Sequence, residues 1–120
     1  MSPKSPLSII PVLSTSDIQR DVEWYAKHAG FEKVFGDEMY AGLQRSNHEI
    51  HLQWHHNNED DPVFPGVIKI FVPDITPYVE EFVERGTIKR DKLRMNTPWG
   101  THEFGFYDLN NNAIFIVQDA

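Results

Sequence analysis

The chain has 120 residues, of which 40% are hydrophobic, and it contains no cysteine. This length supports one compact domain with one core, and the lack of cysteine excludes disulfide frameworks, thiolate zinc modules and thiol nucleophiles. A net charge of −7 repels phosphate backbones, so we expect no nucleic-acid partner. No apolar run approaches the roughly 20 residues needed to cross a bilayer, and the first residues lack the apolar centre of a secretory signal. We therefore expect a cytoplasmic protein with no membrane partner.

The first half of the chain is predicted to form a strand, a helix and three further strands. Residues 7–13 are apolar and strand-like, and residues 14–17 provide side-chain oxygens that can cap a helix. Apolar residues then recur at helical spacing, which predicts a helix over 17–28 that stops before Gly30. Turn-forming residues separate the three strands that follow, at 32–35, 40–45 and 49–54.

The second half repeats this order after a connector. Residues 55–65 are polar and acidic and include two prolines, which is typical of a connector. A strand is predicted over 67–72, and a helix begins at Asp74, with Pro77 in its first turn, and ends at Gly86. Further strands are predicted at 88–95, 103–107 and 113–118, with residues 108–112 as the last hairpin turn.

The two halves also have similar residues at matching positions. Asp17, Val22 and Tyr25 in the first predicted helix recur with the same spacing as Asp74, Val79 and Phe82 in the second. Apolar helical spacing is common enough to match by chance. An internal repeat of this size, however, implies that one half cannot bury its sheet alone. We predict an α+β fold in which residues 1–120 form a single domain built from two βαβββ modules, at about 7–54 and 66–118.

Paired modules with an aspartate at each helix start resemble the vicinal-oxygen-chelate fold of the glyoxalase/bleomycin resistance protein/dioxygenase superfamily. Residues 10–13, residues 40–45 and the block Thr97-Pro98-Trp99-Gly100 are similar to segments of bleomycin resistance proteins. Residues 108–112 are similar to the Asp-Pro-x-Gly-Asn turn of that family, with Leu109 in place of proline and Asn111 in place of glycine, and asparagine tolerates positive φ. The resemblance covers nearly the whole chain and implies a curved mixed sheet around a groove.

Metal-dependent enzymes of this superfamily, as the resemblance implies, hold a divalent ion with His, Glu or Gln from the first and last strand of each module. The corresponding positions here are Ile10, Val67, His51 and Phe115, so His51 alone can coordinate. A useful site needs about three converging donors. We therefore expect no metal and no cofactor, and we favour a protein that is not an enzyme.

Two other functions stay open. One is a metal-dependent lyase, isomerase or dioxygenase in which other donors join His51. Glu49 and Gln53 alternate with His51 and so point the same way, although donors along one strand spread instead of converging. The other is a structural or regulatory interaction module that binds no ligand.

Apolar residues at the metal positions favour an aromatic ligand held by stacking. The resemblance places Tyr40 and Trp99 in the groove, whereas core packing explains Phe104, Phe106 and Trp54 equally well. We predict sequestration of a flat small molecule, such as a cationic drug of the bleomycin type, which the acids at 59–61 attract over longer range. The predicted ligand-binding residues are Tyr40, His51, Trp54, Trp99, Phe104, Phe106 and Phe115.

A second copy of the chain is the expected protein partner. The resemblance implies a symmetric homodimer with two grooves, formed by exchange of the first strand, with Pro11 at the hinge. A proline at this place also fits an edge strand that discourages aggregation.

Overall fold

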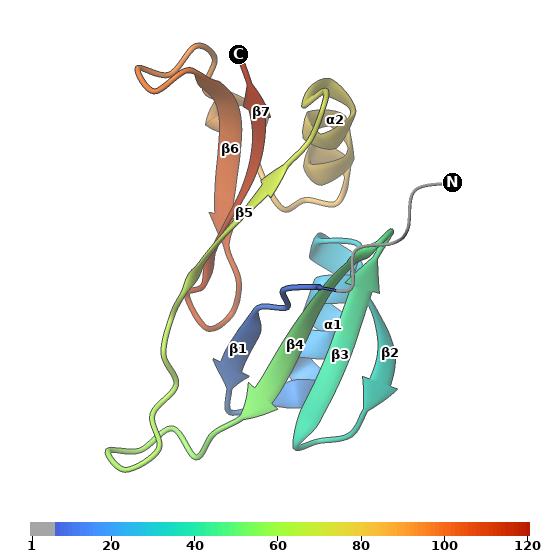
Figure 1. Cartoon of the computed structure of the whole chain (residues 1–120), viewed down its shortest axis with the longest axis vertical. Coiled ribbons are helices and arrows are strands. Elements are labelled where there is room, and N and C mark those ends of the chain that lie inside the picture. Colours follow the sequence, from blue (N-terminus) through green and yellow to red (C-terminus); the bar gives the residue numbers. More distant parts are fainter. Residues whose placement is uncertain (1–6) are drawn as a thin grey trace.

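The computed structural model describes residues 7–120, and its elements form two modules joined by a connector (Figure 1). In the first module the strands pair in the order β1-β4-β3-β2, with β1 parallel to β4 and the other pairs antiparallel. Figure 1 shows α1 behind this sheet. The elements are β1 (Val12–Thr15), α1 (Ile18–His28), β2 (Glu32–Gly36), β3 (Tyr40–Arg45) and β4 (His48–Trp54).

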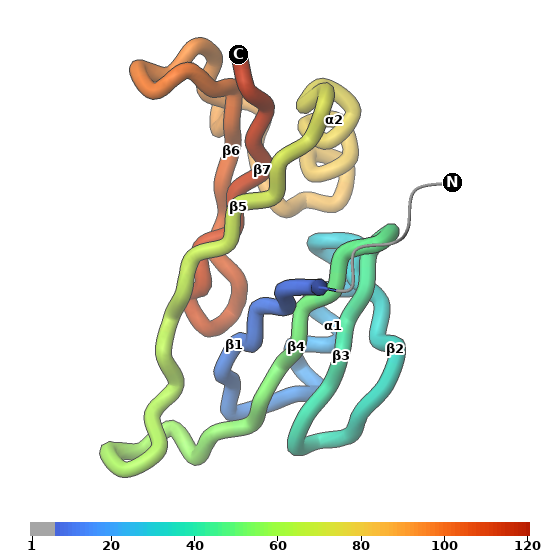
Figure 2. The backbone as a smooth tube through the Cα atoms, in the orientation of Figure 1, coloured from blue at the N-terminus to red at the C-terminus, as the bar shows by residue number. Residues whose placement is uncertain are grey.

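The second module has a smaller sheet of order β5-β7-β6, in which β5 is parallel to β7 and β6 is antiparallel to it. The predicted α+β fold is thus confirmed, although the strands divide between two separate sheets. The connector runs from the end of β4 up to β5 (Figure 2). The elements are β5 (Val67–Phe71), α2 (Thr76–Glu84), the 3₁₀ turn η1 (Arg90–Lys92), β6 (Thr101–Tyr107) and β7 (Ala113–Asp119).

The prediction of the first strand was wrong in its position. Residues 7–11 form no strand, and β1 instead starts at Val12 and continues to Thr15. Pro11 lacks an N–H and contributes only its carbonyl, which accepts a hydrogen bond from the amide of His51 at 2.9 Å. Ile9 is 96% exposed, so the beginning of the apolar run that suggested a strand is not buried within this chain.

The predicted strand at 88–95 was also wrong. Its centre is the 3₁₀ turn η1, and only Arg94 pairs with a strand, through an isolated bridge to Glu103. Residues 89–92 are Lys-Arg-Asp-Lys and offer no alternating apolar face to a sheet. Ile88 and Leu93 at the two ends pack against the core instead.

An aspartate was expected to cap the start of each helix. Asp17 does so at α1, whereas at α2 the aspartate lies one residue before the cap position. Asp17 caps α1, since its side chain accepts a hydrogen bond from the amide of Arg20 at 3.1 Å. At α2 the cap position is Ile75, without a side-chain bond, but Asp74 still accepts from the amide of Thr76 at 3.0 Å. Pro77 lies in the first turn, as predicted.

Strand alternation gives each sheet one face packed on the core and one face without a helix. On β4 and β7, Ile50, Leu52, Ile114 and Ile116 are buried in the core, while His51 and Phe115 between them point the other way. We call the faces that bear His51 and Phe115 the open faces. They carry exposed apolar side chains, among them Phe35, Val67 and Phe71.

Among residues 7–120, no helix has both the length and the apolar character that crossing a membrane requires.

Candidate ligand-binding site

A chain of hydrogen bonds joins three side chains on the open face of the first sheet. The Tyr40 hydroxyl lies 2.7 Å from Nδ1 of His51, and Nε2 of His51 lies 2.6 Å from Oε2 of Glu49. If Nε2 carries the proton and donates it to Glu49, Nδ1 accepts from Tyr40, so both ring nitrogens are engaged. The imidazole is 15% exposed. Because both nitrogens have partners, a ligand would contact the face of the ring and not a nitrogen.

Phe35 covers this group from β2. Its ring meets the His51 ring edge to face at 5.1 Å between centroids and lies over Gly42, which is directly across from His51. A Cβ at Gly42 would fall 2.0 Å from the Phe35 ring, so glycine is needed for this packing. Tyr40, His51 and Phe35 together form an aromatic half-site.

The donors around His51 do not fit a divalent ion. Val12 is the residue of β1 that pairs in register with His51, and Ile10 lies two residues before it; both side chains are apolar. The two imidazole nitrogens already bind Tyr40 and Glu49. Within the described range 7–120, no three His, Asp or Glu side chains are grouped in a way that could hold a metal.

The open face of the second sheet repeats the relation between His51 and Gly42. Phe115 on β7 lies directly across from Gly105 on β6, and a Cβ at Gly105 would fall 2.6 Å from the Phe115 ring. Lys69 on β5 flanks Phe115 on its other side. An aromatic ring backed by a glycine thus occupies the last-strand position in this module.

Trp99 lies in the loop before β6 and is 54% exposed. The guanidinium of Arg94 sits 5.0 Å from its ring centroid, a cation–π distance. Its indole Nε1 donates to Oε2 of Glu103 at 3.4 Å. Gly100 follows at φ 83°, and its amide donates to the carbonyl of Thr97 at 2.9 Å, which closes the turn that presents the indole. Trp99 and Phe115 are the aromatic side chains of a second half-site.

The structure places the other three predicted aromatic residues on the helix side of the sheets. Phe104 and Phe106 are 1% and 9% exposed, and their rings lie 5.5 and 5.3 Å from that of Phe82 on α2. Trp54 packs at the edge of the core and donates from Nε1 to the carbonyl of Ser16 at 3.1 Å. These three rings do not share a face with His51 or Phe115.

A cavity of about 250 Å³ lies between the modules on the helix side. Its walls are mostly apolar and include Tyr25, Ile50, Phe82 and Phe106. Phe106 therefore borders an internal space but not the open face of its own sheet.

The two half-sites lie apart within one chain. Tyr40 and His51 belong to the first sheet, whereas Trp99 and Phe115 belong to the second, and the loop before β6 lies at the end of the second module farthest from the first (Figure 1). Tyr40 and Trp99, which the resemblance placed in the groove, therefore belong to different sheets of one copy.

The acids expected to attract a ligand lie in the connector. Asp61 accepts hydrogen bonds from Nδ1 of His55 at 2.6 Å and from Nδ1 and the amide of His56, each at 2.8 Å. The bonds from His56, and then the one from His55, lower the pKa of Asp61 to about 2.

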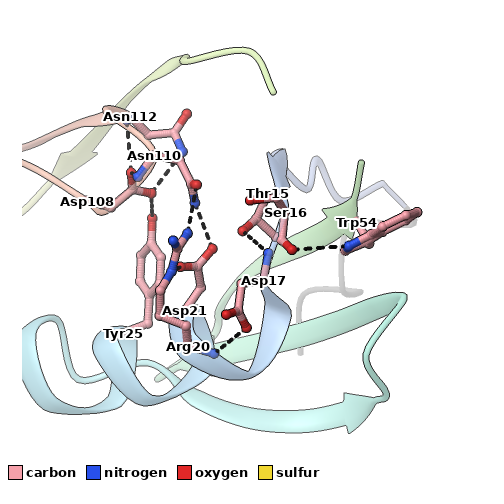
Figure 3. A network of polar contacts seen from close by, with 10 residues as sticks. All are labelled: Thr15, Ser16, Asp17, Arg20, Asp21, Tyr25, Trp54, Asp108, Asn110 and Asn112. Carbon is pink, nitrogen blue, oxygen red and sulfur yellow. Dashed lines mark hydrogen bonds and ion pairs between the residues drawn. The ribbon is translucent and has the colours of Figure 1, made fainter. Parts of the chain in front are cut away.

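Sequence reasoning missed a buried polar network between the modules (Figure 3). Tyr25 on α1 donates to Oδ2 of Asp108 at the end of β6, and Asn112 donates to both oxygens of that carboxylate. Burial and the negative charge of Asp108 raise the pKa of Tyr25, so its hydroxyl keeps its proton. Asn111 has φ 63°, which confirms that asparagine takes the place of glycine in this turn. The resemblance of residues 108–112 to a known turn was the one signal for these residues.

Comparison with known proteins confirms the predicted fold. No protein-family model matches the chain. Bleomycin resistance proteins of Geobacillus stearothermophilus and Staphylococcus aureus are each 24% identical to it, over 93% of this chain and 96% of theirs. The bleomycin-binding protein of Streptomyces verticillus, solved with copper(II)-bleomycin, is 23% identical with a TM-score of 0.70, covering 97% of this chain and 98% of that one. A glyoxalase/bleomycin resistance protein/dioxygenase from Nocardioides is 14% identical with a TM-score of 0.76, covering 98% and 86%.

Proposed function

We propose that this chain, which has the glyoxalase/bleomycin resistance protein/dioxygenase fold, binds a flat aromatic small molecule and sequesters it without converting it. The observation that carries the proposal is the pair of aromatic half-sites on open sheet faces, at places where a metal-dependent relative would need metal ligands. A drug of the bleomycin class is the first candidate, because a similar protein of Streptomyces verticillus was solved with copper(II)-bleomycin. We propose that binding takes place in the cytoplasm, with which a chain without cysteine is compatible.

Stacking and long-range charge together supply the free energy in this proposal. Offset or edge-to-face contact with an aromatic ring contributes about 1 kcal/mol beyond the burial of its area. Tyr40, Trp99 and Phe115 offer such contacts on the two open faces. The net charge of −7 raises the local concentration of a cationic ligand and speeds its association. No step in this process requires a bond to break.

We also propose that the working unit is a homodimer, because the two half-sites of one chain lie on separate sheets. A second copy related by a twofold axis would place the first sheet of each chain opposite the second sheet of the other and thereby form two grooves. Support comes from the apolar side chains on both open faces and from the exposed apolar residue Ile9 just before Pro11. In this arrangement the first strand is the exchanged part, with Pro11 at the hinge.

Titration of a bleomycin-class drug into the protein, followed by calorimetry and by Trp fluorescence, tests the binding proposal. We expect saturable binding with a heat signal, and we expect Trp99→Ala to weaken it about fivefold or more, as loss of a stacking partner of ~1 kcal/mol implies. Trp54→Phe is the matched control, because Trp54 lies on the helix side and should leave the affinity within twofold. Absence of heat and of a fluorescence change at excess drug would refute the drug as ligand.

Mixing two defective variants tests the dimer. Tyr40→Ala disables the first-sheet half-site and Trp99→Ala the second-sheet half-site, so neither homodimer should bind well. After the two are unfolded together and refolded, a mixed dimer has one groove with both defects and one groove with none. Up to one quarter of the grooves should then regain wild-type affinity. A monomeric mass in solution, or a mixture that regains nothing, would exclude the shared groove.

A further inference from the structure

Glu103 is a carboxylate on the open face of the second sheet. It lies across from Val117 and two residues before Gly105, so it shares the face of Phe115, while Phe104 and Phe106 point toward the helix side. Glu103 is nevertheless only 5% exposed, whereas Trp99, which contacts it, is 54% exposed. A nearly buried charge therefore lies beside an exposed indole.

Only one of the two carboxylate oxygens of Glu103 has hydrogen-bond partners in the described part of the chain. Oε2 accepts from the Thr101 hydroxyl at 3.0 Å and from the Trp99 indole at 3.4 Å. Every fully buried polar side-chain atom between residues 7 and 120 does have a partner. The free oxygen, Oε1, must therefore reach the surface, where a molecule from outside can contact it.

No cation neutralises this carboxylate among residues 7–120. The ion pairs found there involve other acids, and the nearby Arg94, whose backbone pairs with that of Glu103, directs its guanidinium over Trp99. Burial of a carboxylate costs several kcal/mol unless charge or hydrogen bonds compensate it. The hydrogen bonds that Thr101 and Trp99 donate to Oε2 compensate only part of the cost of burying Glu103.

Other buried acids of the same protein are compensated more fully. Asp21, 1% exposed, pairs with Arg20 at 3.0 Å and accepts from Asn110 at 2.7 Å. Asp108, 5% exposed, accepts hydrogen bonds on both oxygens. Side chains and backbone of the protein thus supply the partners of Asp21 and Asp108. Glu103, whose Oε1 has no such partner in the described part of the chain, is an exception among the buried carboxylates.

We propose that Glu103 is the anchor for a cationic group of the ligand, an ammonium, amidinium or guanidinium, whose attached aromatic ring contacts Trp99. This inference rests on the proposed function and assigns the charge recognition to one residue. A cationic donor on Oε1 makes a charge-assisted hydrogen bond to a carboxylate whose residue is largely buried, so solvent and salt screen the interaction less than they screen one with a fully exposed acid. Asp61, by contrast, already binds His55 and His56.

A pair of planar probes that differ in charge tests the anchor. 2-Naphthamidine carries the cation, and 2-naphthamide is its neutral analogue of nearly equal shape. Titrated into the full-length wild-type protein, the amidine should bind at least about tenfold more tightly than the amide, as expected for a hydrogen bond to a charged group. Glu103→Gln, which keeps an acceptor for Thr101 and Trp99, should lose that advantage and bind both probes about equally.

Glu59→Gln is the matched control, because it makes the same change of net charge in the exposed connector and should keep the amidine preference within twofold. Equal affinity of the wild type for both probes, or a preference that survives Glu103→Gln, overturns the anchor but leaves aromatic sequestration standing. Binding of neither probe, together with no binding of a bleomycin-class drug, overturns aromatic sequestration itself. Circular dichroism and the solution mass of Glu103→Gln complete the test, since a lower mass would assign Glu103 to the contact between copies and overturn the anchor.

Discussion

The hydroxyl of Tyr25 on α1 donates a hydrogen bond to the carboxylate of Asp108 at the end of β6, and so ties a helix of the first module to a turn of the second. Both residues are buried, at 1% and 5% exposure. Around them, Asn112 and Asn110 hold the carboxylate and Asp21 in place (Figure 3). The relative position of the two modules thus depends in part on one phenol.

Replacement of Tyr25 by Phe removes this hydrogen bond without changing the packing of the ring. The Oδ2 atom of Asp108 keeps only the bond from Asn112, so we expect the free energy of unfolding to fall by about 1–3 kcal/mol. Urea denaturation measures it. Tyr107→Phe, at a residue that is 69% exposed, should change stability by less than about 0.5 kcal/mol. Equal stability of Tyr25→Phe and the wild type would show that this network does not hold the modules.

The glycines behind the two half-site rings give a second prediction. Alanine at Gly42 or Gly105 places a Cβ 2.0 or 2.6 Å from the ring of Phe35 or Phe115, so the ring must move. We expect each substitution to cost about 1–3 kcal/mol of stability, as overpacking does, and to weaken aromatic ligands. Gly66→Ala is the control, because its Cβ would meet only Asn112 Oδ1 at 3.7 Å. A ligand affinity unchanged by both Gly42→Ala and Gly105→Ala would remove these rings from the site.

Metal removal should not affect ligand binding. The nitrogens of His51 are engaged by Tyr40 and Glu49, so dialysis against a chelator is expected to leave the affinity for an aromatic ligand within twofold. Elemental analysis of the purified protein before and after dialysis checks this directly. A stoichiometric ion that disappears in His51→Ala would instead support a metal-dependent enzyme.

The connector gives a prediction for acid pH. The folded-state pKa of Asp61, about 2, lies below the ordinary 3.8, so its contacts stabilise the protein above pH 3.8 and lose that effect as the pH falls through about 2. The stability difference between the wild type and Asp61→Asn should therefore shrink over this window and vanish below it. Urea titrations at several pH values measure the difference, with Asp60→Asn as the control. A difference that stays constant down to pH 2 contradicts the role given to His55 and His56.

Local patterns predicted the elements whose signals are local. The cap at Asp17, the proline at the start of α2 and the alternation along β4 all depend on neighbouring residues, and the structure confirms them. The segment 88–95 does not form the predicted strand, because its charged residues Arg90–Lys92 form the 3₁₀ turn η1. Whether a segment forms a strand depends on the neighbouring strands with which it pairs, and these are distant in the sequence.

The placement of the site residues shows the same limit. Alternation predicts that Phe104 and Phe106 share a face of β6 and that Gly105 lies on the other, but it does not say which face a helix covers. Packing against Phe82 on α2 decides that question. The bond between Tyr25 and Asp108 joins distant parts of the chain, and no spacing rule in either half predicts it.

The exposed tip of the connector, at residues 57–60, is hydrogen-bonded within the connector, whereas Phe64 and Gly66 near its end bond to Ser14 and Asn112. The contacts between the modules include the bond of Tyr25 with Asp108 and the ion pair of Arg45 with Glu81. A backbone break after Asn58 would leave both intact, because the exposed tip of the connector contributes to neither. The two halves are therefore suited to separate expression and fragment complementation, in which reassembly of the polypeptide pieces reports on the proximity of the proteins fused to them.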